Sequence, residues 1–86
     1  MTYIAQELYR GWEITIRCSA GKSSAAYQTS YTAVASAELL PGQNPADWID
    51  PRIQLVTTGN RSFAQSAGCL EVLLLEVRQL IDALQK

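Results

Sequence analysis

Residues 12–18, Trp-Glu-Ile-Thr-Ile-Arg-Cys, alternate strictly between apolar and polar side chains. Successive side chains of a β-strand point to opposite faces, so this period predicts a strand with one dry face and one wet face. A sheet built from such strands buries its dry face under a second layer, which favours a two-layer fold. The predicted dry face consists of Trp12, Ile14, Ile16 and Cys18.

Residues 27–39 repeat this alternation and predict a second long strand. The apolar face includes three alanines, whose small size suits a helix lying close across the sheet. A helix over residues 33–40 is the alternative, but Tyr31, Thr32 and Val34 are β-prone and no N-cap residue precedes them. The predicted face consists of Tyr27, Thr29, Tyr31, Ala33, Ala35, Ala37 and Leu39.

The last segment predicts an amphipathic helix of about 23 residues. Ser62-Phe63-Ala64-Gln65 matches a capping box, which places the start of the helix at Ser62. Apolar residues then recur at alternating spacings of four and three, as expected for one face of a helix. This stripe consists of Phe63, Ala67, Leu70, Leu74, Val77, Ile81 and Leu84, and it is widened by Leu73 and Leu80.

The remaining segments complete the predicted architecture. Small polar residues over 19–26 indicate a hairpin loop, and the three prolines between 41 and 51 indicate a connection without a regular strand. Residues 52–58 predict a shorter strand around Ile53, Leu55 and Val56. We therefore expect a single α+β domain over residues 1–86: a three-stranded antiparallel meander, four-stranded if residues 2–9 also form a strand, with one long C-terminal helix packed on one face.

Composition argues against most catalytic chemistry. The sequence has no histidine, which removes the commonest general base and metal ligand. Cys18 and Cys69 lie far apart without a second Cys nearby, so we expect reduced core thiols, no metal site and no cofactor. The net charge of −1 gives no strong field toward nucleic acid or anionic lipid. The sequence thus favours a protein that is not an enzyme.

Processing signals point to the cytoplasm. The first residues lack the basic and apolar regions of a signal peptide. The longest aliphatic run, Val72 to Leu75, is far shorter than the ~20 residues that a membrane span needs. We therefore expect no membrane association and a cytoplasmic location.

Two groups of residues are candidates for an interaction site. Asp47, Trp48 and Asp50 lie in the proline-framed connection and form a recognition loop, or else Trp48 and Ile49 fold back as a lid over one end of the core, with the two Asp residues as solvated turn formers. Gly68, Val72 and Leu75 form a second helix ridge away from the main stripe, with Gly68 suggesting close approach. This ridge either packs under the proline-rich connection or meets a second subunit, and a homodimer is our favoured interpretation.

Tyr9-Arg10-Gly11-Trp12-Glu13-Ile14 and the ending Ile81-Asp82-Ala83-Leu84 resemble a group of small bacterial proteins that open with Tyr-x-Gly-Tyr/Trp-Glu-Ile, most without an assigned function. The order of strands and helix is also similar to HicB-type antitoxins and to part of double-stranded-RNA-binding domains. Leu40-Pro41-Gly42-Gln43 is only a fragment of the HicB motif, and the Lys-rich helix of the RNA-binding type is absent. No functional residue carries over from either family.

Together these observations favour a non-enzymatic module that self-associates through the second helix ridge or the edge of the sheet. The alternative is a weak nucleic-acid-binding or antitoxin-like regulatory module, which rests on similarity of topology.

Overall fold

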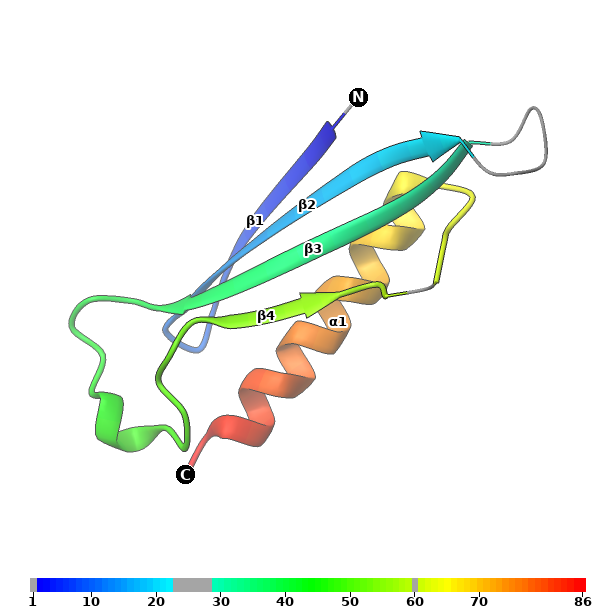
Figure 1. The fold of residues 1–86 in the computed structure, drawn as a ribbon. Helices are drawn as coiled ribbons and strands as arrows, with labels where there is room; N and C mark the ends of the chain where they lie inside the picture. The colour runs from blue at the N-terminus through cyan, green and yellow to red at the C-terminus, as the bar shows by residue number, and fades with distance from the viewer. Residues whose placement is uncertain (1, 23–28, 60) are drawn as a thin grey trace.

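The computed structural model describes residues 2–22, 29–59 and 61–86, which form one antiparallel sheet and one long helix (Figure 1). The sheet has four strands in the order β1-β2-β3-β4. The α+β meander with a C-terminal helix is therefore confirmed, and residues 2–9 supply its fourth strand. The elements are β1 (Thr2–Tyr9), β2 (Trp12–Lys22), β3 (Thr29–Leu39), a 3-10 helix η1 (Pro45–Asp47), β4 (Gln54–Thr57) and α1 (Ser66–Leu84).

The core lies between α1 and the two central strands. The predicted dry face of β2 is at most 1% exposed from Trp12 to Cys18. The register places Ile16 opposite Ala35 and Ile14 opposite Ala37, and both alanines are buried. Because these alanines are short, α1 lies close across this face of the sheet (Figure 1). The predicted face of β2 is correct, and so is that of β3 from Tyr31 to Leu39, whereas Tyr27 lies outside the described residues. A helix over 33–40 is excluded.

A tight turn joins β1 to β2. Tyr9 pairs with Trp12, which leaves the two-residue loop Arg10-Gly11. Both residues have positive φ, 51° and 84°, as a type I′ hairpin turn requires. A Cβ at Gly11 would also lie 2.5 Å from Cδ of Gln43, so that flexible, exposed side chain would have to move.

The helix begins later than the sequence predicts. It starts at Ser66, and its N-cap residue Gln65 makes no side-chain capping bond, so the predicted capping box at Ser62 is wrong. Phe63 instead pairs with Tyr31 at the end of β3: its N–H donates to the Tyr31 carbonyl at 3.0 Å and its carbonyl accepts at 2.8 Å. Backbone pairing with the sheet has replaced the first helical turn.

The buried line of α1 is also rotated from the predicted stripe. Leu73, Val77 and Ile81 are buried as expected, but Leu70 and Leu74 only flank the core and Ala67 is exposed. A repeat of four residues advances about 40° per step around a helix, so the contact line turns as the helix crosses a twisted sheet. The buried residues are Cys69, Leu73, Val77 and Ile81.

Two shorter predictions need correction. The third predicted strand, 52–58, is confined to 54–57, and two of the residues around which it was predicted, Ile53 and Leu55, are 60% and 69% exposed. The predicted loop 19–26 begins too early, because β2 continues to Lys22. The rest of that loop lies outside the described residues.

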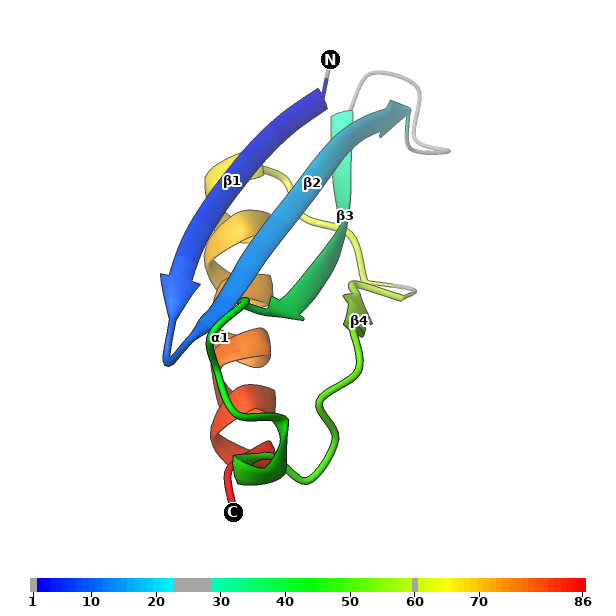
Figure 2. The ribbon, with the colours of Figure 1, turned by 90° about the vertical axis from the view of Figure 1, so that its left-hand side faces the viewer.

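Only one face of the sheet is covered. In Figure 2 the strands β1 and β2 lie in front of α1, and α1 packs against the opposite face. Large aliphatic side chains that are 50–69% exposed lie on the uncovered face, here called the open face. They are Ile4 and Leu8 on β1, Val34 on β3 and Leu55 on β4.

The open face also carries a like-charge pair. Glu13 on β2 lies directly opposite Glu38 on β3, and like charges in this position destabilise a sheet. We expect Glu38→Lys to raise the free energy of unfolding by about 0.5–1 kcal/mol, measured by urea denaturation. Salt should reduce the gain.

Glu71→Lys makes the same change in net charge at an exposed position of α1 and serves as the control. Equal stability of the two variants would show that the pair Glu13–Glu38 does not matter.

Candidate functional site

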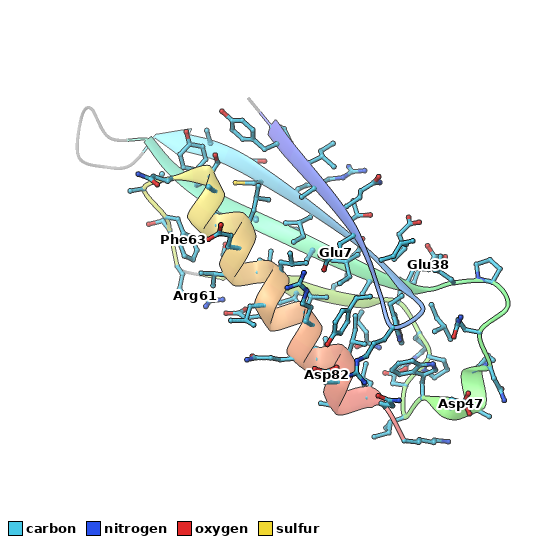
Figure 3. The ribbon with its side chains drawn as sticks, turned by 180° about the vertical axis from the view of Figure 1, so that it is seen from behind. Glu7, Glu38, Asp47, Arg61, Phe63 and Asp82 are labelled. Atoms are coloured by element: carbon cyan, nitrogen blue, oxygen red, sulfur yellow. The ribbon has the colours of Figure 1, made fainter. Side chains whose placement is uncertain are left out.

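The two groups of candidate residues lie along different parts of α1. The connection that carries Asp47 packs at the C-terminal end of the helix, as Figure 3 shows for Asp47. Its Ile49 N–H donates to the Leu84 carbonyl at 2.7 Å, and the Lys86 N–H donates to the Asp47 carbonyl at 3.0 Å. Gly68, Val72 and Leu75 lie in the N-terminal half of α1. The structure does not bring the six residues into one site.

Trp48 acts as a lid. Its side chain is 6% exposed and packs edge-on against Trp12, with ring centroids 5.5 Å apart. Such T-shaped pairs contribute about 0.5–1.5 kcal/mol beyond area burial. Ile49 is 63% exposed and takes no part in the lid. Trp48 therefore closes one end of the core and does not present its ring to a partner.

The carboxylates of Asp47 and Asp50 have different surroundings. Asp50 accepts hydrogen bonds from Nε of Arg52 at 2.9 Å, from Nη2 at 3.0 Å and from the Arg52 backbone N–H at 3.1 Å. The Arg52 bonds hold the pKa of Asp50 well below its usual range. Asp47 is exposed. Asp50 is thus an ionised member of a local ion pair and not a general acid.

A cleft of about 660 Å³ opens where the β1–β2 turn, the connection and the end of α1 meet. Arg10 lines it, but its Nε lies 3.1 Å from Asp82 and its Nη1 donates to Gln85 at 2.6 Å. Side chains of both charges line the cleft, so it favours neither an anion nor a cation. The lining residues are Arg10, Gln43, Ala46, Asp47, Trp48, Gln85 and Lys86.

Neither a metal centre nor a membrane span is found in the described part of the chain. Within residues 2–22, 29–59 and 61–86, no three His, Cys, Asp or Glu side chains come together to hold a metal ion. No described helix combines the length and apolar character needed to cross a bilayer.

The second helix ridge is weakly apolar. Leu75 is 55% exposed, Val72 is half-buried, and a Cβ built on Gly68 meets nothing within 4 Å. The proline-rich connection bonds to α1 at Leu84, which is about 13 Å along the helix from Leu75. The connection therefore does not cover this ridge, and no side chain or backbone in the described part of the chain closely approaches Gly68.

The open space at Gly68 gives a stability prediction. Gly68→Ala should raise the free energy of unfolding by up to about 1 kcal/mol, because Ala favours a helix and nothing stands in its way. Thermal and urea denaturation measure this. Gly11→Ala is the contrasting variant and should destabilise, since its φ is positive and its Cβ would meet Gln43. A destabilised Gly68→Ala protein would contradict the open environment.

The two cysteines meet in the core. Cys18 on β2 and Cys69 on α1 are both fully buried, and they form no disulfide. Burial, together with a hydrogen bond to the Cys18 thiol, raises the pKa of Cys69 to about 11. The Cys69 thiol is therefore protonated at neutral pH, and the pair joins the start of α1 to the central strand.

We expect neither thiol of the native protein to react with a thiol reagent at neutral pH, because both sulfurs are buried and burial raises the pKa of Cys69 further. Both should react after unfolding in denaturant, as a colorimetric thiol assay measures. Leu75→Cys places a thiol at an exposed position and should react at once. Rapid labelling of the unmodified native protein would contradict the burial of the pair.

Ion pairs attach α1 to the edge strand β1. Arg78 contacts Glu7 through Nε at 2.8 Å and through Nη2. Asp82 accepts a hydrogen bond from the Tyr9 hydroxyl at 2.9 Å and pairs with Arg10. Figure 3 labels Glu7 and Asp82 on the two elements.

The sequence analysis missed the open face as a candidate surface. Its members Ile4 and Leu8 lie on a strand where apolar residues occur on both faces. No local signal in β1 marks its outward face, because the charged residue Glu7 faces α1, where Arg78 pairs with it, while Ile4 and Leu8 face outward.

Comparisons with protein-family models, curated proteins and solved structures found no match to this chain. The class of protein is thus set by the fold alone: a two-layer α+β domain with an open sheet face.

Proposed function

We propose that this protein is a non-enzymatic interaction module that self-associates through the free edge of its sheet at β1. The observation that carries the proposal is the exposure of Ile4 and Leu8, 61% and 68%, on an edge strand of eight residues. Exposed apolar groups beside unpaired backbone groups are typical of a surface that another chain covers.

The sheet edge is better supported than the helix ridge. The ridge offers one exposed aliphatic, Leu75, and single exposed aliphatic residues are common on monomers. Strand β1 offers two such side chains spaced four residues apart on one face, together with its backbone. Trp48, Asp47 and Asp50 support the core and a local ion pair, so we assign them no direct role in binding.

The side chains that could take part in catalysis fit a non-catalytic role. Asp50 is held by Arg52, Cys69 is buried and protonated, and the sequence has no histidine. Two cysteines that meet in the core without forming a disulfide are typical of a reducing compartment, which supports the proposed cytoplasmic location.

The alternative, a weak nucleic-acid-binding or antitoxin-like regulatory module, has less support. Four of the five arginines form ion pairs with carboxylates: Arg10, Arg52, Arg61 and Arg78. Their charge is largely neutralised, so few phosphates could be contacted. Submicromolar binding to a duplex or single strand at physiological salt, weakening as salt rises, would favour this alternative.

Light scattering after size-exclusion chromatography tests self-association. We expect the wild type to dimerise with increasing concentration, and the double variant Ile4→Lys, Leu8→Lys to remain a folded monomer, because both side chains are exposed and lysine on an edge opposes pairing. Circular dichroism checks the fold.

Leu55→Lys is the matched control, since Leu55 lies on the same face at the opposite edge of the sheet and should leave the dimer intact. A wild type that stays monomeric at high concentration would overturn the proposal. Loss of the dimer in Leu75→Glu, with the β1 variant still dimeric, would move the interface to the helix ridge.

A further inference from the structure

The ladder geometry shows which backbone groups of β1 are free. The Leu40 N–H donates to the Gly11 carbonyl at 2.9 Å, which extends the β2–β3 register by one pair. Hydrogen-bonded pairs alternate along an antiparallel ladder, so the odd-numbered residues of β2 bond to β3 and the even-numbered ones to β1. Their partners on β1 are odd-numbered. The N–H and C=O groups of Thr2, Ile4, Gln6 and Leu8 therefore point outward, away from the sheet.

The two edges of the sheet differ in protection. Strand β4 has four residues and lies between Pro51 and Gly59, so it offers little to another strand. Strand β1 has eight residues and contains no Lys, Pro or Gly. Its one charged side chain, Glu7, is turned toward α1 and bound by Arg78. Figure 2 shows β1 as the outermost strand along its whole length. Strand β1 therefore lacks the lysine, proline and short length that block many sheet edges, and Arg78 neutralises its one inward-facing charge.

We infer that β1 pairs in antiparallel fashion with β1 of a second copy, about a two-fold axis at Gln6, to form one continuous sheet of eight strands. This inference rests on the proposed self-association and names its geometry. A two-fold axis perpendicular to the sheet makes the pairing antiparallel and isologous. It also leaves both helices on the same side, so the open faces of the two copies become continuous.

The side chains of β1 are complementary to themselves in this register. An axis at Gln6 places Ile4 opposite Leu8 of the second copy, and the symmetry repeats this pair with the copies exchanged. Both exposed aliphatic side chains of each strand therefore meet a partner in a cross-strand pair. On the face toward α1 it places Tyr3 opposite the second copy's Tyr9. No like charges face one another.

The neighbouring registers are poorer. An axis at Ala5 places Ile4 opposite Gln6 and Leu8 opposite Thr2, so each aliphatic group meets a polar one. An axis at Glu7 sets the two Glu7 carboxylates against each other, which is destabilising. Side-chain matching and charge therefore both select the axis at Gln6.

The size of the contact sets its strength. About seven residues of each copy, from Tyr3 to Tyr9, take part, whereas a standard interface uses roughly 20–30 residues a side. We therefore expect a reversible dimer whose population depends on protein concentration.

Cross-linking through position 6 tests the register. The Cα atoms of a hydrogen-bonded antiparallel pair lie about 5.5 Å apart, which a disulfide can span. Under mild oxidation, in which a disulfide reagent accepts the electrons of two thiols, Gln6→Cys should form a dimer joined Cys to Cys at position 6, identified by mass spectrometry. Arg17→Cys, exposed on the open face of β2, is the control and should cross-link at least about tenfold more slowly.

The outcomes separate the two proposals. If the wild type dimerises but Gln6→Cys cross-links no faster than Arg17→Cys, the register is wrong and self-association stands. If the wild type stays monomeric, both proposals are overturned and the edge belongs to a different partner chain.

A backbone variant gives an independent measurement. Gln6→Pro removes an N–H that points outward, and Pro is tolerated on an edge strand at such a position. We expect a folded protein, by circular dichroism, whose dimerisation is weakened about tenfold or more, since two hydrogen bonds at the axis are lost. Dimerisation unchanged from the wild type would overturn the pairing.

Discussion

The close approach of α1 to the alanines of β3 is the contact on which the rest of the structure depends. Ala33, Ala35 and Ala37 are at most 4% exposed, and their short side chains let the helix reach past β3 to the larger residues of β2. A bulkier residue in this row would lift α1 from the sheet and uncover Trp12, with its packing partner Trp48. Because the helix packs so closely, it alone covers the inner face of the sheet. The opposite face carries no second layer among the described residues.

Local periodicity predicted the parts of the fold that depend on local pattern. Both long strands and the C-terminal helix follow from side-chain alternation and spacing, and so does the burial of Trp12 and Cys18. The start of the helix did not follow, because Phe63 is held by backbone bonds to Tyr31, a partner 32 positions away that no local motif reveals. The third predicted strand contains adjacent apolar residues, Leu55 and Val56, so its sequence does not define which of them faces the core.

The candidate site was harder to predict for a related reason. A sequence shows that Trp48 lies in a proline-framed connection, but it does not show that Trp48 packs against Trp12 in the fold. It shows Gly68 in a helix but not the open space beside it. Ile4 and Leu8 are exposed because α1 packs on the other face of β1. There Glu7 and Tyr9 contact charged side chains of the helix. Such long-range choices come from packing and ion pairing together, and no single segment encodes them.

The meander order also governs how the chain gains its structure. Each strand pairs only with its neighbours in sequence, so every hairpin can form from contacts that are close along the chain. The helix, which comes last, contacts chiefly β2 and β3 and has no apolar surface to dock on until that central hairpin exists. The turn at Arg10-Gly11 lies outside this first unit, and β1 is fixed by its ladder with β2 and by the ion pairs to α1. Strand β1 contributes none of the fully buried residues, so it is an element that the chain can release while the centre of its core stays packed.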